Sequence, residues 1–235
     1  MKIDIKLFAD GADLNGIMEL YGSGLVDGIT TNPTLMKKAG IADYEKFANE
    51  VASRITDIPV SFEVLSDDFA EMERQARKIG GWGENVYIKI PVTNTRGESS
   101  APLINKLSRD GYKLNVTAIL TLEQVDAVLR ALDPAAQAYV SVFAGRIADT
   151  GVDPCPIVRK AAAMCGKRSP NIKCLWASTR ELLNIFQAQE CGADIITVTH
   201  DILKKLPMIG RDHNELSLDT VKMFYSDAVS AGFVL

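Results

Sequence analysis

Short apolar segments alternate along this chain with longer amphipathic segments. The short segments are rich in β-branched and aromatic residues and repeat with period two, which predicts strands. We expect strands at 5–9, 28–30, 60–65, 85–93, 113–119, 138–143, 172–177 and 195–198. The segments between them have helical periodicity or helix-capping residues at their starts. Helices are therefore expected at 13–21, 44–54, 66–79, 99–110, 121–132, 156–165, 179–189 and 200–206.

Eight strands alternating with eight helical segments are typical of an α/β protein with a closed (β/α)8 TIM barrel. An open, doubly wound sheet is the alternative. The first predicted strand is not followed by a G-x-G-x-x-G segment, so a dinucleotide-binding fold has no support. Residues 1–206 are expected to form the catalytic barrel domain. Residues 207–235 add a loop and an amphipathic helix near Leu218 to Ala231, which exceed what barrel closure needs and could pack on a neighbouring subunit.

Composition narrows the classes of function. The 235 residues carry a net charge of −4, which gives no reason to expect nucleic acid or an anionic membrane as a partner. We find neither a signal peptide nor an apolar run long enough to span a bilayer, so a cytoplasmic protein is expected. The four cysteines form no C-x-x-C pair and are interpreted as reduced thiols. With two histidines, a histidine-rich metal site is excluded.

The predicted strand NVYIKIPVT (85–93) places a lysine inside an apolar segment. Lys89 shares one face with Tyr87, opposite Val86, Ile88 and Ile90. Pro91 cannot donate to a neighbouring strand, so Lys89 should lie near the end of this strand. Loss of water around the ammonium would lower its pKa and leave a neutral amine, the nucleophile of Schiff-base chemistry. The other interpretation is a lysine that pairs with a carboxylate or reaches solvent.

Polar side chains gather at the predicted strand ends, where the chemistry of such barrels is found. The positions are Asp10, Thr31, Asn32, Glu63, Lys89, Asn115, Thr117, Ser141, Phe143, Trp176 and Ser178. Each has a structural explanation by itself, such as a helix cap for Asp10 or an Asn-Pro turn for Asn32. Together, two carboxylates, a lysine, amides and hydroxyls facing one barrel mouth favour an acid/base site with a covalent amine.

Five segments resemble the signature strands of transaldolases, most closely the small branch that includes fructose-6-phosphate aldolase. They are TTNPT (30–34), IKIPVT (88–93), LNVTAIL (114–120), SVFAGRI (141–147) and ASTR (177–180). The resemblance implies that Lys89 forms the Schiff base, that Asp10 is the acid/base, and that Glu63 and Thr117 hold a catalytic water. It also implies that Asn32, Asn115 and Ser141 hold the dihydroxyacetone portion of a sugar, and Thr31 beside them is expected to bind substrate. No metal or dissociable cofactor is implied, because the imine nitrogen is the electron sink.

Two positions distinguish transfer from aldol cleavage in this family. Fructose-6-phosphate aldolase resembles this chain but carries glutamine and tyrosine where Glu63 and Phe143 stand, whereas the transferases carry glutamate and phenylalanine. A tyrosine hydroxyl near the enamine can assist its protonation, and phenylalanine leaves the enamine for an acceptor aldehyde. Transfer is therefore expected.

A further group of residues resembles the family's clamp for the terminal anion of the sugar: Arg146, Ser178 and Arg180. Guanidinium groups and hydroxyls suit tetrahedral oxyanions. Trp176 stands where phosphate-sugar members usually have a small residue, and an indole N–H suits a singly charged sulfonate. Arg180 could instead be a solvated surface residue, and Trp176 could be a barrel-filling aromatic.

The resemblance thus implies a transaldolase of small sulfo- or phospho-sugars. The expected donor is 6-deoxy-6-sulfofructose, which would release sulfolactaldehyde and transfer dihydroxyacetone to glyceraldehyde 3-phosphate or erythrose 4-phosphate. Two alternatives stay open: an enzyme that uses only phosphorylated sugars, and a non-catalytic sugar-phosphate-binding barrel. The same resemblance implies a homo-oligomer, a decamer of two pentamers.

Overall fold

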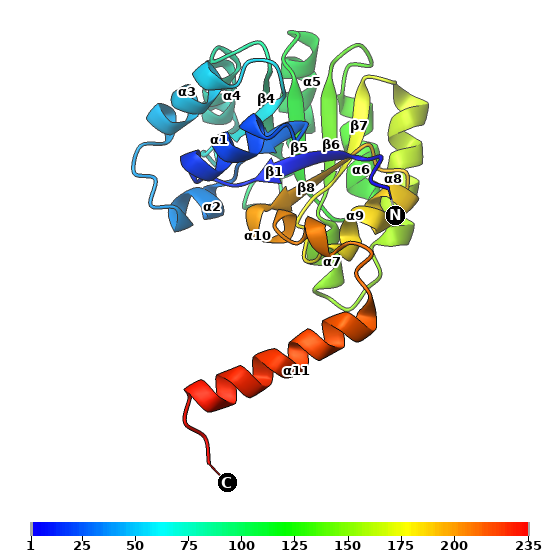
Figure 1. The fold of residues 1–235 in the computed structure, drawn as a ribbon. Helices are drawn as coiled ribbons and strands as arrows, with labels where there is room; N and C mark the ends of the chain where they lie inside the picture. The colour runs from blue at the N-terminus through cyan, green and yellow to red at the C-terminus, as the bar shows by residue number, and fades with distance from the viewer. Residues whose placement is uncertain (1, 235) are drawn as a thin grey trace.

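The chain folds into a closed barrel of eight parallel strands, as expected (Figure 1). The computed structural model describes residues 2–234. Each strand pairs with the next in sequence, and the last pairs with the first. The strands are β1 (Lys6–Asp10), β2 (Gly28–Thr30), β3 (Val60–Glu63), β4 (Val86–Pro91), β5 (Leu114–Ile119), β6 (Ala138–Val142), β7 (Ile172–Trp176) and β8 (Ile195–Thr199).

Helices follow the strands and cover the outside of the barrel (Figure 1). Several begin where a short polar side chain accepts a hydrogen bond from the first helical turn; Asp68 and Thr121 are examples, and Thr121 forms a full capping box. The helices are α1 (Leu14–Gly22), α2 (Pro33–Lys38), α3 (Tyr44–Arg54), α4 (Phe69–Gly80), α5 (Ala101–Arg109), α6 (Leu122–Ala131), α7 (Ala144–Ala148), α8 (Cys155–Arg168), α9 (Leu183–Glu190), α10 (His200–Leu203) and α11 (His213–Ser230), with a 3-10 turn at Leu206–Met208.

The two faces of each strand contribute to two separate cores. The outward faces pack against the helices and include Val86, Ile88 and Ile90 of β4. The inward faces form a second cluster inside the barrel: Phe8, Tyr87, Tyr139, Leu175, Ala177 and Ile195. The rings of Tyr87 and Tyr139 are stacked there with centroids 4.1 Å apart. Packed side chains therefore fill the inside of the barrel at this level.

Two short helices were not expected from the sequence. Helix α2 directly follows the Asn-Pro turn, with the Asn32 side chain accepting a hydrogen bond from the Leu35 amide. Helix α7 begins just after Phe143 and carries Arg146. Both are short, so they show little of the helical periodicity on which the expectation depended. Each follows a strand directly and brings polar side chains to the barrel mouth.

The C-terminal helix α11 extends away from the barrel (Figure 1). It begins at His213 rather than near Leu218, because the Asp212 carboxylate caps the amides of Asn214 and Glu215. None of its described residues is buried. Among residues 2–234, no helix is both long enough and apolar enough to cross a membrane.

Candidate active site

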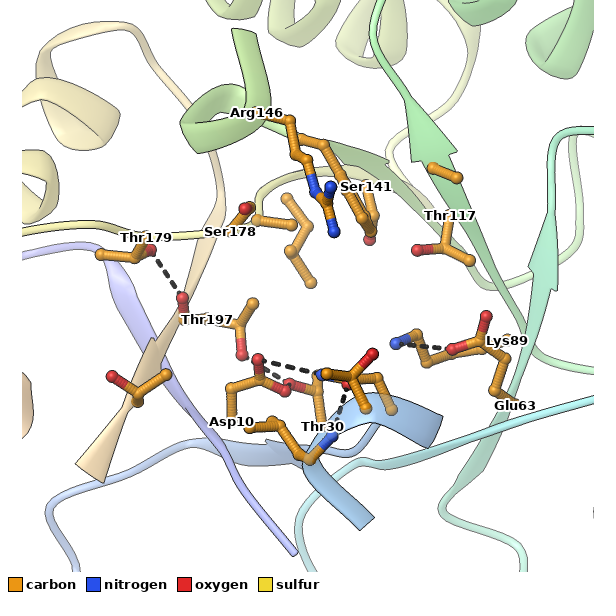
Figure 2. Close-up of a pocket in the computed structure, with 18 of the residues that line it drawn as sticks. Asp10, Thr30, Glu63, Lys89, Thr117, Ser141, Arg146, Ser178, Thr179 and Thr197 are labelled. Atoms are coloured by element: carbon orange, nitrogen blue, oxygen red, sulfur yellow. Dashed lines mark hydrogen bonds and ion pairs between the residues drawn. The ribbon is translucent and has the colours of Figure 1, made fainter. Parts of the chain in front are cut away.

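A cavity of about 490 Å³ opens at the carboxyl ends of the strands. It brings together most of the side chains expected at the site: Asp10, Asn32, Glu63, Lys89, Asn115, Thr117, Ser141, Phe143, Arg146, Ser178 and Arg180. Figure 2 labels seven of them, among them Asp10, Glu63 and Lys89. These residues come from seven different strands or the segments that directly follow them. Parallel strands in a closed barrel end at one rim, which is why residues distant in sequence meet there.

Lys89 lines the cavity beside Glu63. Only 7% of the residue is exposed, and its Nζ donates a hydrogen bond of 2.8 Å to the carbonyl oxygen of Thr31. The same nitrogen lies 3.2 Å from a carboxylate oxygen of Glu63 (Figure 2). Glu63 and Lys89 are register partners on adjacent parallel strands, so strand pairing itself sets this separation. A lysine amine with a carboxylate partner thus faces an open cavity.

Glu63 is held by a tyrosine that the sequence did not indicate. The Tyr44 hydroxyl, at the start of α3, donates to the carbonyl oxygen of Glu63 and accepts from its amide, both at 2.8 Å. The pairing of β2 with β3 ends at Thr30 and Ser61. The backbone amide and carbonyl of Glu63 on the side that faces β2 therefore have no partner within the sheet. Burial raises the pKa of Tyr44, which keeps its hydroxyl protonated. Tyr44 therefore completes the hydrogen bonding of the last residue of β3.

Asp10 ends β1 on the opposite side of the cavity. Its Oδ1 accepts a hydrogen bond of 2.9 Å from the Thr30 hydroxyl, and its Oδ2 lies 3.4 Å from the Asn32 amide nitrogen. Loss of hydration raises the pKa of Asp10, while the charge of Lys89 and the hydrogen bonds from Thr30 and Asn32 oppose that rise. A carboxyl with a raised pKa is suited to accept and return a proton near neutral pH.

A chain of polar side chains crosses β3, β5 and β6 beneath the cavity. The Ser141 hydroxyl donates to the side-chain oxygen of Asn115 at 2.6 Å, and the amide nitrogen of Asn115 donates to the Ser61 hydroxyl at 3.1 Å. These bonds fix the orientation of the Asn115 amide. The Thr117 hydroxyl lines the same cavity and has no hydrogen-bond partner among the described residues. An unpaired buried hydroxyl at a cavity wall is a position for a water or a substrate oxygen.

Cationic side chains gather at the far side of the cavity. Arg146 of α7 points into it (Figure 2), and no carboxylate of residues 2–234 lies within ion-pair distance of it. Arg180 is held by the Asp149 carboxylate through two hydrogen bonds, and its guanidinium lowers the pKa of Asp149. Asp149 is therefore ionised at neutral pH. Two guanidinium groups and one carboxylate leave a single net positive charge.

Backbone geometry places Ser178 in this cluster. Its φ is +64°, a left-handed conformation that is uncommon for a residue other than glycine. A Cβ on Gly145 would lie 1.6 Å from the Ser178 carbonyl oxygen, so only glycine fits at position 145. The close approach of α7 to the end of β7 thus depends on Gly145 and brings Arg146 and Ser178 to one wall.

Trp176 does not lie where the sequence suggested. It is fully buried in the outer core between the barrel and its helices, on the face of β7 opposite the inward-facing Leu175 and Ala177. The left-handed turn at Ser178 breaks the alternation of faces, so Ser178 reaches the cavity while Trp176 does not. The expectation that the indole contacts the substrate anion is therefore wrong. The alternative, an aromatic residue that fills the core, describes its position.

Thr31 also contributes differently from expectation. Its hydroxyl donates to the Ser61 carbonyl oxygen and does not line the cavity, and the residue is fully buried. Its backbone carbonyl accepts the hydrogen bond from Lys89. The neighbouring Thr30 reaches the cavity with its side chain instead.

Sequence reasoning missed several residues at this site. They are Lys38, Tyr44, Thr30, Asp149 and Thr197. Thr30 belongs to the TTNPT segment and Thr197 shares the inward face of β8 with Ile195, which are signals that could have indicated them. Tyr44 and Asp149 lie outside the strands, so nothing in the strand pattern indicated them. Among residues 2–234, no group of three or more histidine, cysteine, aspartate or glutamate side chains could hold a metal ion.

The arrangement combines three chemical capabilities in one cavity. A lysine amine can add to a carbonyl carbon, two carboxyls near it can move protons, and a cationic wall can hold an anion. The amine and the cationic wall lie on different sides of the cavity (Figure 2). A linear substrate with a carbonyl near one end and an anion at the other would fit both.

Comparison with known proteins adds an independent line of evidence. Residues 7–233 match the family described as transaldolase/fructose-6-phosphate aldolase. A probable transaldolase of Methanococcus maripaludis is 38% identical over 202 residues, 86% of this chain and 89% of that protein. A probable transaldolase of Dehalococcoides mccartyi is 35% identical over 86% of this chain and 90% of its own length. One from Streptococcus agalactiae is 35% identical over 83% of this chain and 86% of its own.

Proposed function

Because this chain belongs to the transaldolase/fructose-6-phosphate aldolase family, we propose that it transfers dihydroxyacetone between sugars through a Schiff base on Lys89. One observation carries the proposal. A nearly buried lysine amine faces an open cavity with a carboxylate 3.2 Å away and an unpaired threonine hydroxyl in the same wall. This is the set of groups that imine formation on a ketone requires.

The proposed reaction begins when the Lys89 amine adds to the C2 carbonyl of a ketose. Glu63 and Thr117 hold a water between them, through which protons move as the carbinolamine loses water and becomes an iminium ion. Asp10 then removes the proton of the C4 hydroxyl, and the C3–C4 bond breaks. Its electrons move into the iminium group, which becomes an enamine, and the distal aldehyde leaves. The nitrogen is the electron sink throughout.

The retained enamine carries the dihydroxyacetone portion. Asn32, Asn115 and Ser141 are proposed to bind its hydroxyl groups, and the fixed orientation of the Asn115 amide supports that role. Phe143 lines the cavity and offers no proton to the enamine. The enamine therefore waits for an acceptor aldehyde, with Asp10 returning the proton to the new hydroxyl. This supports transfer over simple aldol cleavage.

We also propose that the donor is a ketose with a singly charged terminal anion, with 6-deoxy-6-sulfofructose as the candidate. Trp176 does not support a sulfonate donor, because its side chain faces away from the cavity. The remaining support is the single net charge of Arg146, Arg180 and Asp149, which matches a sulfonate better than a phosphate near −2. Lys38 at the cavity wall is the observation that favours phosphorylated donors instead. Competition between sulfofructose and fructose 6-phosphate, with either glyceraldehyde 3-phosphate or erythrose 4-phosphate as acceptor, decides between them.

Borohydride trapping tests the Schiff base directly. Reduction in the presence of donor should add the mass of the dihydroxyacetone unit at Lys89, and Lys89→Met should abolish the adduct. Lys38→Met removes another lysine of the same cavity and should leave the adduct intact. An adduct on a different lysine, or none with any ketose, would refute the mechanism. Tight ketose binding without an adduct or turnover would indicate a non-catalytic binding barrel.

For the assembly, we propose a decamer of two pentamers in which α11 packs on a neighbouring subunit. The supporting observation is that α11 and the residues after it expose large apolar side chains, among them Phe224 (64% exposed) and Phe233 (79%). Solvent exposure of so many apolar groups on one helix is unfavourable unless a partner covers them. Light scattering coupled to size-exclusion chromatography should give ten chains for the full protein and fewer after removal of residues 211–235.

A further inference from the structure

Three oxygen atoms from three strands form a row in the wall of the cavity. They are Oδ1 of Asp10 on β1, Oγ1 of Thr30 on β2 and Oγ1 of Thr197 on β8 (Figure 2). The Asp10–Thr30 separation is 2.9 Å, and the Thr30–Thr197 separation is 2.5 Å. Thr30 and Thr197 are 2% and 6% exposed, so solvent does not compete for these contacts.

The number of protons determines the direction of this row. Each threonine supplies one hydroxyl proton, and an ionised carboxylate supplies none. Two contacts therefore require that Thr30 donates to Asp10 and Thr197 donates to Thr30. A proton on Oδ1 would put three protons into two contacts, and no other acceptor for the Thr197 hydroxyl is recorded among residues 2–234. The row thus disfavours a proton on Oδ1 and leaves Oδ2 as the oxygen that accepts a proton, while the hydrogen bond from Thr30 to the ionised carboxylate is the stronger, charge-assisted kind.

We propose that Thr197 is a positioning residue for the acid/base step at Asp10, acting through Thr30. It orients the Thr30 hydroxyl toward Oδ1 and leaves Oδ2 of Asp10 for the hydroxyl group of the substrate. The inference rests on the proposed function, because it assigns Thr197 to the step in which Asp10 moves the proton of the C4 hydroxyl.

Other groups also face Asp10, but none of them replaces the hydrogen bond that this row makes to Oδ1. Lys89 and Glu63 act on it through charge across the cavity, in opposite directions, and Asn32 contacts Oδ2 at 3.4 Å. His200 of α10 packs against Gly11, next to Asp10, and burial lowers its pKa, so it is neutral at pH 7. No partner of residues 2–234 bonds its Nε2. None of these groups contacts Oδ1, which leaves its orientation to the two threonines.

The test replaces the hydroxyl with a methyl group of similar size. In Thr197→Val, Thr30 loses its donor and can turn its own proton away from Asp10. We expect kcat to fall about tenfold with KM changed less than about twofold, since a general base that is less well oriented slows chemistry more than binding. The acid limb of the pH profile should move up by about half to one pH unit, because loss of a hydrogen bond to a carboxylate raises its pKa. Thr197→Ser keeps the hydroxyl and should restore both values.

Two further measurements separate this role from a structural one. Borohydride trapping with free dihydroxyacetone, which forms the imine without breaking a carbon–carbon bond, should give the Lys89 adduct at the wild-type yield in Thr197→Val, because imine formation does not use Asp10. In a protein that already carries Thr30→Val, adding Thr197→Val should lower kcat little further, because the row of hydrogen bonds is already broken. If Thr197→Val melts more than about 10 °C below the wild type, Thr197→Cys is used in its place. Its thiol is a weaker hydrogen-bond donor, so the acid limb of the pH profile should move in the same direction by a smaller amount.

The outcomes are distinguishable. Two results would overturn the role of Thr197 and leave the Schiff-base mechanism in place. One is a Thr197→Val protein that forms the adduct normally and whose acid limb does not move. The other is full additivity of the effects of Thr30→Val and Thr197→Val on kcat. Failure of the wild-type protein to form any adduct would instead overturn the proposed function.

Discussion

Replacement of Tyr44 by phenylalanine removes one oxygen atom and two hydrogen bonds. The hydroxyl donates to the Glu63 carbonyl and accepts from the Glu63 amide, both at 2.8 Å, and no strand residue lies on that side of Glu63 to replace it. The ring would keep its packing near Trp82, with centroids 6.3 Å apart. The substitution therefore tests the hydroxyl with little change of shape.

The magnitude follows from the groups left without partners. A buried polar group that loses its partner costs about 1–3 kcal/mol, and Tyr44→Phe leaves two. A cavity of about 210 Å³ lined by Tyr44, Glu63 and Trp82 lies alongside, and a water there can replace part of the loss. The lower end of the range, about 2 kcal/mol, is therefore expected. For a chain of this size that lowers Tm by about 4–8 °C.

Thermal unfolding followed by circular dichroism measures this change. Tyr21→Phe is the matched control, because it removes a tyrosine hydrogen bond of 2.7 Å to an exposed carboxylate, Asp57, and should change stability by less than about 0.5 kcal/mol. The rate of borohydride-trapped imine formation should also fall, since the carboxylate beside Lys89 is less well placed. Equal melting temperatures for Tyr44→Phe, Tyr21→Phe and the wild type would refute the reasoning.

Other expectations follow from the same cavity. Asp149→Asn frees the charge of Arg180 and should shift the kcat/KM ratio about fivefold toward phosphate donors; an unchanged ratio in donor competition would contradict the charge argument. Phe143→Tyr should raise release of free dihydroxyacetone without acceptor by about tenfold or more, measured with a reductase-coupled assay. Trp176→Phe should lower stability by about 1–2 kcal/mol and leave the sulfonate-to-phosphate ratio unchanged, since the indole lies outside the cavity; a changed ratio would restore a role in binding. Burial raises the pKa of Asp10, so the activity lost on acidification should be lost at a pH above the ordinary range of a carboxyl. An acid limb of the pH–activity profile near pH 4 would be inconsistent with that burial.

The barrel and its chemical centre could be predicted because their signals are local. Strand β4 shows this most clearly: its alternating residues place Lys89 and Tyr87 inside and Val86, Ile88 and Ile90 outside, as the structure has them. Pro91 ends the strand for the same local reason, since it lacks an amide hydrogen. The meeting of Asp10, Glu63 and Lys89 followed from fold class alone, because all strands of such a barrel end at one rim.

The faces of residues beyond the regular strands depended on the tertiary structure. Trp176 and Ser178 are two residues apart, so alternation predicts one face for both, and the left-handed φ at Ser178 separates them. The close approach of the Ser178 carbonyl to helix α7 is possible only because Gly145, on that helix, has no side chain. Strand periodicity applies within a strand and ends where the backbone leaves the β region.

By itself, the sequence determined which residues lie in strands, which faces are apolar and that an amine stands among polar groups at the barrel mouth. Hydrophobic period and residue type are sufficient for that, because they act over a few neighbouring positions. Only the tertiary structure decided that Tyr44 holds Glu63, that Asp149 neutralises Arg180 and that Thr197 reaches Asp10 through Thr30. Each of these contacts joins elements far apart in the chain, and barrel closure and helix packing, rather than local pattern, bring their atoms within hydrogen-bond distance.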